Sequence, residues 1–182
     1  IGPSKGLETG DHLWISRYLL TRVTEDLGIG LSFDPKPVKG DWNGSACHTN
    51  FSTKKMRDAN GFDLLKEYVK KLEKAHDRHI KMYGEGNKYR LSGEHETANI
   101  DEFTSGVGDR GASIRIPADK NLNSKGYFED RRPASNVDPY IASALVYATC
   151  IKDGEGIDDL EEHFNKWKEE TGQNPHMAYA DE

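Results

Sequence analysis

The sequence predicts an α+β domain in which a sheet of short strands is flanked by helices. Two patterns support this fold class. Alternation of polar and apolar side chains with a period of two, typical of strands with one face in a core, occurs in residues 46–53, 113–117 and 127–131. Apolar residues recur at helical spacing in residues 11–27, 62–83, 138–151 and around 160–167.

Length and composition indicate a polar, acidic protein of one domain, or of one domain with a tail. A linker predicted at 152–156 separates a domain at 1–152 from a charged helical tail at 153–182. Its 25 Lys and Arg residues stand against 31 Asp and Glu residues. The resulting net charge of −6 argues against nucleic acid or an anionic membrane as a partner. No apolar run is long enough to span a membrane. The two cysteines fit neither a zinc site nor a disulfide framework, which indicates a reducing compartment.

The expected elements begin and end at recognisable signals. Asp11 is placed to cap a helix that ends before Gly28 and carries an apolar stripe. Residues 29–33 alternate and predict a further strand. Residues 62–83 show the clearest helical pattern. Asp138 and Pro139 start a helix that is apolar on nearly all sides, so we expect it to be buried.

The strand predicted at 46–53 has one face suited to ligand binding. Its alternation places His48, Asn50 and Ser52 on one face, and Cys47 and Phe51 on the core side. His48 is a potential metal ligand, although a histidine in a half-buried sheet can equally serve as a structural hydrogen-bonding group.

The stretch Gly-Tyr-Phe-Glu-Asp-Arg-Arg-Pro (126–133) has the same property. If it is extended, Tyr127, Glu129 and Arg131 share a face, which combines an aromatic ring, an oxygen ligand and a bidentate guanidinium. The alternative is an ion pair between Glu129 and Arg131 on a solvated strand.

Several arginines in polar, glycine-rich segments suggest an anion site. They are Arg90, Arg110, Arg115 and Arg131. If the three strands lie side by side, their polar faces form a floor on which His48 and Glu129 could hold a divalent cation, while arginines neutralise phosphate oxygens. Phosphoryl transfer needs mainly positioning, metal charge and such cationic groups. A metal-dependent hydrolase is the weaker alternative, because no general base is evident.

Several motifs resemble glutamine synthetase of the eukaryotic type. They are Gly-Asp-His-Leu-Trp (10–14), Phe-Asp-Pro-Lys-Pro (33–37), Trp-Asn-Gly-Ser-Ala-Cys-His-Thr-Asn-Phe-Ser-Thr (42–53), Gly-Glu-His-Glu-Thr (93–97), Ser-Ile-Arg-Ile-Pro (113–117) and the stretch at 126–133. The resemblance runs in order from the start of the chain to about Ile151. It implies a curved, mostly antiparallel sheet with helices outside, in a catalytic domain that is incomplete at its N-terminus.

The resemblance also implies an activity, the ATP-dependent ligation of ammonia to L-glutamate through a γ-glutamyl phosphate. His48 and Glu129 would bind Mg²⁺ or Mn²⁺. The residues that would serve ATP are Asn50, Ser52, Arg115 and Tyr127. Those that would serve glutamate and the phosphoryl group are Asn43, Gly44, Arg90, Arg110 and Arg131. Glu96 would lie on a flap that shields the intermediate and helps take a proton from ammonium, so the implied catalytic groups are Glu96, Arg110 and Arg131.

The family's remaining features set two further expectations. Members assemble as homo-oligomeric rings with active sites between subunits, in the cytoplasm or in plastids. Most of the family's metal-binding glutamates have no counterpart in this sequence, and Lys5 stands where many members carry one. We therefore expect the 182-residue chain to be inactive alone. The alternative is a non-catalytic, synthetase-like structural or interaction protein.

Overall fold

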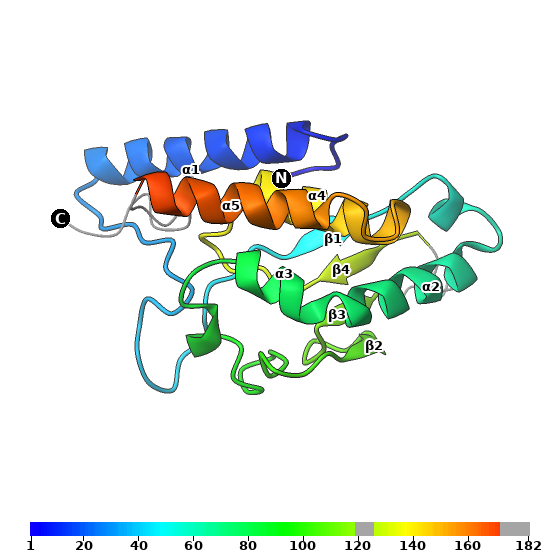
Figure 1. Ribbon diagram of the computed structural model, residues 1–182. Helices are drawn as coiled ribbons and strands as arrows, with labels where there is room; N and C mark the ends of the chain where they lie inside the picture. The colour runs from blue at the N-terminus through cyan, green and yellow to red at the C-terminus, as the bar shows by residue number, and fades with distance from the viewer. Residues whose placement is uncertain (119–125, 172–182) are drawn as a thin grey trace.

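The computed structural model describes residues 1–118 and 126–171 (Figure 1). The helices and strands are, in chain order, α1 (Glu8–Asp26), β1 (Thr49–Phe51), α2 (Gly61–Lys74), α3 (His76–Met82), β2 (Ser105–Val107), β3 (Ile114–Ile116), β4 (Phe128–Asp130), α4 (Pro139–Ile151) and α5 (Ile157–Thr171). Two short 3-10 helices, η1 (Lys55–Arg57) and η2 (Asn87–Tyr89), follow β1 and α3. Within these residues, no helix is both long and apolar enough to cross a membrane.

The four strands form one mixed sheet in the order β1-β4-β3-β2. Strand β4 pairs antiparallel with β1 and with β3, whereas β2 pairs parallel with β3. Helices flank this sheet (Figure 1), so the predicted α+β class is confirmed. Strand β4 is internal, and its position is therefore fixed by backbone hydrogen bonds on both edges.

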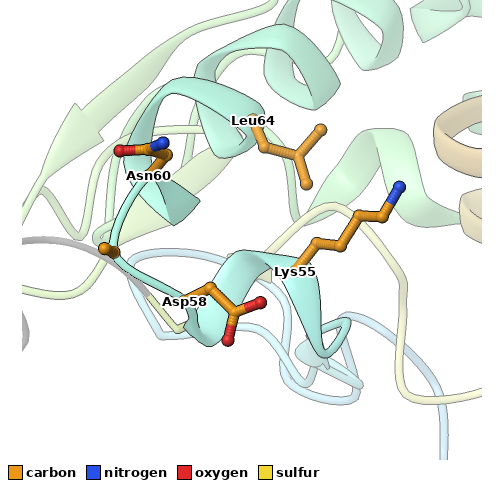
Figure 2. Close-up of a pocket in the computed structure, with 5 residues that line it drawn as sticks. Lys55, Asp58, Asn60 and Leu64 are labelled. Carbon is orange, nitrogen blue, oxygen red and sulfur yellow. The ribbon is translucent and has the colours of Figure 1, made fainter.

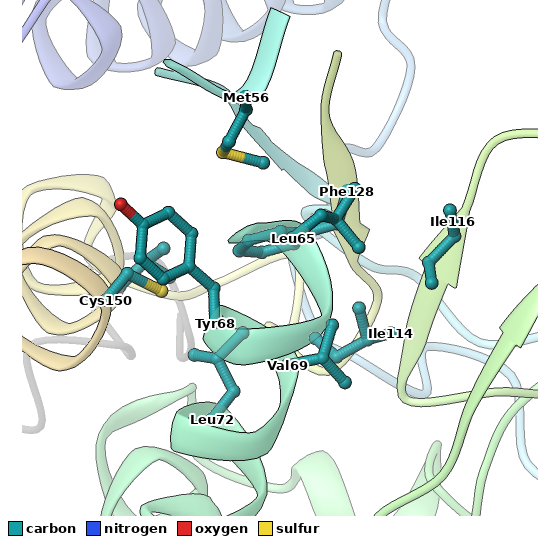
Figure 3. Packing of buried hydrophobic residues seen from close by; sticks show 10 residues of the cluster. Met56, Leu65, Tyr68, Val69, Leu72, Ile114, Ile116, Phe128 and Cys150 are labelled. Carbon is teal, nitrogen blue, oxygen red and sulfur yellow. The ribbon is translucent and has the colours of Figure 1, made fainter. Parts of the chain in front are cut away.

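One face of the sheet packs against α2 to form the main hydrophobic core (Figure 3). The buried members of this core are Met56, Leu65, Tyr68, Val69, Leu72, Ile114, Ile116, Phe128, Val146 and Cys150. Phe51 of β1 packs on Phe128 of β4, with ring centroids 5.5 Å apart. The alternation predicted for the strands is therefore confirmed on their apolar side, and the opposite face remains for polar side chains.

A second hydrophobic cluster joins α4 to α3 and α5. Its buried members are Met82, Tyr83, Val137, Ala142, Leu145, Ala148, Ile157 and Phe164. Ion pairs add to this packing, because Arg78 Nη2 of α3 lies 2.5 Å from Asp158 Oδ1 and 2.9 Å from Glu161 Oε2 of α5. The predicted charged tail is therefore a packed helix as far as residue 171, and residues 172–182 lie outside the described part.

Helix α1 forms close to the predicted bounds, but it begins at Glu8, so Asp11 lies inside its first turn and does not cap it as predicted, and its apolar stripe faces solvent. Between 54% and 60% of the surface is exposed for Ile15, Tyr18, Leu19 and Val23. The helix is held by polar contacts instead. Arg17 Nη2 donates hydrogen bonds to the carbonyl oxygens of Ser135 and Val137, at 2.6 and 2.8 Å.

Two further expectations about secondary structure were wrong. Residues 29–33 are irregular, because no described strand lies beside them to complete a ladder. The helix expected at 62–83 is divided at Ala75, whose φ of −97° and ψ of 8° lie outside the helical region. The break gives α3 its own direction, and His76 and His79 of α3 contact Arg132.

Both cysteines are free thiols. Cys150 is buried in the main core, where desolvation raises the pKa of its thiol to about 12. Cys47 is half-buried, and burial also raises its thiol pKa.

A polar network is buried between α3, β4 and α4. Arg132 Nη2 lies 2.8 Å from Asp130 Oδ2, and both side chains are almost completely buried. Although burial opposes ionisation, the charge of Arg132 holds the pKa of Asp130 below its ordinary value. Burial, assisted by Arg132, lowers the pKa of His79 to about 3, so the imidazole is neutral near pH 7.

Replacing a core leucine should be far more harmful than replacing a leucine of the α1 stripe. Leu65 is fully buried and Leu19 is 54% exposed. We expect Leu65→Ala to lower the free energy of unfolding by about 2–5 kcal/mol. The matched variant Leu19→Ala should change it by about 0.5 kcal/mol or less. Urea unfolding followed by circular dichroism measures both. A comparable loss in the two variants would show that the α1 stripe is covered in solution.

Acid should destabilise the fold through His79. In the unfolded chain His79 is protonated below about pH 6.5, its ordinary pKa. In the folded chain it becomes protonated only near pH 3. The free energy of unfolding therefore decreases as the pH is lowered between these two pKa values. His79 contributes up to about 1.4 kcal/mol to this decrease per pH unit. Urea unfolding at pH 7.5, 6 and 5 measures the slope. His79→Gln should reduce it, whereas His163→Gln on the exposed side of α5 should not. An NMR titration of His79 near pH 6.5 would contradict this account.

Candidate active site

The polar face of the sheet carries a row of side chains across adjacent strands. In the strand register, Asn50 of β1 and Arg115 of β3 lie on either side of Glu129 of β4. Gly106 of β2 is the register partner of Arg115, and it leaves the end of the row without a side chain. Because residues that are direct partners point to the same face, the three strands present a common polar floor, as the alternation predicted.

Glu129 is the centre of this floor. Its Oε2 lies 2.5 Å from Arg115 Nε and 3.3 Å from Arg131 Nη1, and its Oε1 lies 3.1 Å from His48 Nδ1. Glu129 is only 7% exposed. The carboxylate of Glu129 thus contacts two guanidinium groups and an imidazole. The sum of the charges of Glu129, Arg115 and Arg131 is positive.

His48 supplies a neutral imidazole next to Glu129. Burial lowers its pKa, and Arg131 lowers it further, while Glu129 acts in the opposite direction. In the absence of a metal, the simplest assignment is that Nδ1–H donates to Glu129, because an ionised carboxylate only accepts hydrogen bonds.

The pair formed by His48 and Glu129 fits part of a metal site. Adjacent ligands of an octahedral ion with bonds of about 2.1 Å are about 3 Å apart, close to the 3.1 Å between Nδ1 and Oε1. Within the described residues, however, no group of three or more His, Cys, Asp or Glu side chains could hold an ion. These residues therefore supply two ligands of about six and do not form a complete site.

Arg131 closes one side of the floor. Besides Glu129, its Nη1 lies 3.4 Å from His48 Nδ1, and its Nη2 donates to the carbonyl oxygen of Glu96 at 3.0 Å. Its Nε is buried and has no hydrogen-bond partner among the described residues. Arg131 thus connects the sheet to the loop that contains Glu96.

That loop has an unusual backbone and contacts two other segments. His95 and Glu96 have φ values of 52° and 59°, in the left-handed region that non-glycine residues seldom adopt. Glu96 Oε1 lies 3.3 Å from Arg110 Nη1, with both side chains more than half exposed. His95 Nε2 lies 3.1 Å from Asp41 Oδ1, an exposed residue that the sequence did not single out.

Arg90 is buried against the chain's own backbone. Its Nη2 donates to the carbonyl oxygens of Arg131, Arg132 and Pro133, most closely to Arg132 at 2.6 Å. Desolvation, with Arg131 nearby, lowers the pKa of Arg90 to about 10, which still leaves it charged near pH 7. In this structure Arg90 therefore supports the segment that follows β4.

Gly44 is required by this arrangement. A Cβ at Gly44 would collide with Cγ of Arg90 and would lie 2.7 Å from the carbonyl oxygen of Pro35. The resemblance implied that Gly44 serves glutamate and the phosphoryl group; in this structure the stem of Arg90 occupies the space beside this glycine.

The other predicted residues lie around the floor. Ser52 follows β1, and its hydroxyl donates to the carbonyl oxygen of Gly126 and accepts from Arg57 Nη1 at 2.8 Å. Nothing in the sequence distinguished Arg57, because isolated surface arginines are common. Tyr127 directly precedes β4 and is partly buried, while Asn43 is exposed next to Gly44.

A pocket of about 370 Å³ lies at η1 and the start of α2 (Figure 2). Its lining consists of Lys55, Asp58, Ala59, Asn60 and Leu64. None of the predicted site residues lines this pocket, so the polar floor is the candidate active site.

Comparison with curated proteins gives several close relatives. Rice chloroplastic glutamine synthetase is 57% identical over 151 residues, which are 83% of this chain. The Arabidopsis cytosolic isozyme 1-5 is also 57% identical, and maize root isozyme 5 is 56% identical, over the same length. Over most of its length, the chain is homologous to glutamine synthetase. It spans only 35% of the rice protein and 43% of the Arabidopsis glutamine synthetase. No family model matches the chain.

Substitution of Gly44 should displace Arg90. We expect Gly44→Ala to lower the free energy of unfolding by about 1–3 kcal/mol, because the added methyl overlaps the side chain of Arg90 and the carbonyl of Pro35. Gly30→Ala is the matched control, since a Cβ there meets nothing within 4 Å and the backbone is not left-handed. Urea unfolding compares the two. Equal stabilities would contradict the close packing of Arg90 on Gly44.

Proposed function

We propose that this chain is the C-terminal catalytic portion of a glutamine synthetase, a glutamate–ammonia ligase that forms γ-glutamyl phosphate from ATP and L-glutamate. The observation that carries the proposal is the row formed by Asn50, Glu129 and Arg115, which His48 and Arg131 extend. Homology at 57% identity supports it.

The proposed roles follow from where charge develops in the reaction. The transferred phosphoryl group carries negative charge on its oxygens, and Arg115 and Arg131 lie on the floor where such a group would be neutralised. Strand alternation assigns Asn50, Ser52 and Tyr127 to the side of Glu129, where they would bind ATP. Asn43, Gly44, Arg90, Arg110 and Arg131 would bind glutamate, with Arg90 acting through the backbone that it supports.

Glu96 would act at the edge of the site. Its loop contacts Arg131 through the backbone and Arg110 through the carboxylate. The loop would thus cover the intermediate, and the Glu96 carboxylate, which pairs with Arg110 in this structure, would take a proton from ammonium. Its left-handed backbone is the kind of local strain that proteins retain at functional positions.

His48 and Glu129 would provide two ligands for Mg²⁺ or Mn²⁺, which would supply the Lewis acid that neutralises the phosphate oxygens. Because two ligands do not hold such an ion against water, we propose that the 182-residue chain binds nucleotide but does not turn over alone.

The relatives extend the proposal to assembly and location. We propose a homo-oligomeric ring with sites between subunits, and a cytoplasmic location with the plastid as the alternative. Proteins named as cytosolic and as chloroplastic glutamine synthetases are both among the relatives. The names of these relatives favour an enzyme over a non-catalytic synthetase-like protein.

Removal of Arg115 should weaken nucleotide binding selectively. We expect Arg115→Gln to raise the Kd for MgATP about 10- to 100-fold, because each charge-assisted hydrogen bond contributes about 1.5–3 kcal/mol. Arg22→Gln, on the exposed side of α1, should leave the Kd within about twofold, since it removes only a surface pair with Glu25. Isothermal titration calorimetry on the 182-residue chain measures both.

Three outcomes would contradict the proposed function or its limits. Failure of the wild-type chain to bind MgATP, or equal affinities of the two variants, would show that the polar floor does not bind the nucleotide. Metal-dependent glutamine formation by the isolated chain would show that its metal site is complete.

A further inference from the structure

The side chains of strand β4 and of the two residues after it alternate between the two faces of the sheet. Candidate site residues lie on one face, and a buried ion pair lies on the other. Glu129 and Arg131 lie on the polar face, where they are 3.3 Å apart. Asp130 and Arg132 alternate with them and are buried on the other side. The orientation of the first pair therefore depends on how firmly the second pair is held.

Asp130 and Arg132 are held by a complete set of hydrogen bonds. Asp130 Oδ1 accepts from the backbone N and from Nε of Arg132, at 3.1 and 2.9 Å. Asp130 Oδ2 accepts from Arg132 Nη2 at 2.8 Å and from the hydroxyl of Tyr83 at 2.9 Å. Each carboxylate oxygen of Asp130 thus accepts two hydrogen bonds, which fixes the rotation of this carboxylate.

The hydrogen bonds continue from Tyr83 to helix α4 in a single direction. Tyr83 has one hydroxyl proton, which goes to the ionised Asp130, so its oxygen accepts the 2.8 Å bond from His79 Nδ1–H. The 3.3 Å contact of Arg132 Nη2 with the same His79 nitrogen is then not a hydrogen bond. The Nε2 of neutral His79 then accepts from the hydroxyl of Thr149, also at 2.8 Å. This Thr149–His79–Tyr83–Asp130 relay joins α4 and α3 to β4 through groups that are almost completely buried.

Arg132 is also tied to the loop that bears Glu96. His76 Nε2 lies 2.9 Å from the carbonyl oxygen of Ile100, and its Nδ1 lies 3.2 Å from Arg132 Nη1. A neutral ring that donates to Ile100 can accept from Arg132, so both contacts are satisfied at once. The carbonyl of Arg132 is itself bound by Asn87 Nδ2 at 2.8 Å.

We propose that Thr149, His79 and Tyr83 are positioning residues for the candidate active site, acting through Asp130 and Arg132 on the orientation of Glu129 and Arg131. The proposal rests on the function proposed above. Apolar side chains of similar size could fill the same space without loss of stability, but they would not fix the rotation of a strand about its own axis. A fully satisfied polar relay does so, because its bonds have defined directions.

Removal of one hydroxyl tests the relay. Tyr83→Phe deletes the bond to Asp130, and the matched control Tyr140→Phe deletes another tyrosine–aspartate bond, the 2.5 Å contact with Asp11 between α4 and α1. We expect Tyr83→Phe to raise the Kd of the 182-residue chain for MgATP about fivefold or more. Tyr140→Phe should change it by less than about twofold. Melting temperatures of both variants are recorded beside the calorimetry.

A second pair of variants probes the far end of the relay, where folding is less at risk. Thr149→Val keeps the shape of the side chain but removes the donor to His79, so it should weaken binding in the same direction as Tyr83→Phe. Thr149→Ser keeps the hydroxyl and should restore the wild-type Kd. A role limited to stability would instead lower the melting temperature without moving the Kd.

An NMR measurement separates this proposal from the proposed function. The Nε–H resonance of Arg131 reports the surroundings of that side chain without any ligand. It should shift in Tyr83→Phe and Thr149→Val but not in Tyr140→Phe, even if wild-type chain fails to bind MgATP and the proposed function falls. An unmoved resonance in the relay variants would overturn the positioning role. So would equal losses of affinity in Tyr83→Phe and Tyr140→Phe.

Discussion

The buried ion pair between Asp130 and Arg132 is the interaction on which the arrangement of this chain depends. Removing both charges from water is costly, and the pair persists because every polar atom of the carboxylate has partners. The pair is located at the end of strand β4, which lies between two antiparallel neighbours and beside the main core. The sheet, the helices and the loop after α3 all meet at this pair. The pair therefore restricts rotation of β4 about its own axis, and with it the orientation of the side chains on the polar face.

Period-two alternation was sufficient to predict which strand residues face the core and which face the polar floor, because it depends only on backbone geometry. It could not predict whether residues 29–33 would find a neighbouring strand, nor that the three-residue strand β2 would pair in parallel. The division of the long helix at Ala75 was also hidden: His76, directly after the break, contacts Arg132 more than fifty positions away, and helix propensity does not reveal such a contact.

The candidate site was predictable as a set of residues on a face but not as a set of pairs. Arginine can donate to carbonyl oxygens as well as to phosphate or carboxylate, so the sequence does not show that Arg90 supports the backbone of Arg132 while Arg115 pairs with Glu129. The resemblance to glutamine synthetase named the groups, and the structure adds that the single carboxylate of Glu129 already pairs with two guanidinium groups. An incoming cation would have to compete with them for this carboxylate.

The buried thiol of Cys150 provides a built-in reporter of core opening. Alkylating reagents attack the thiolate, and a thiol with a pKa of about 12 in a closed core offers almost none. Its rate of modification would therefore follow the transient separation of α4 from the sheet, in the same way that amide exchange follows local unfolding. Because Val146 and Phe128 line the same core, that rate would report how often the support beneath β4 loosens while the rest of the chain remains folded.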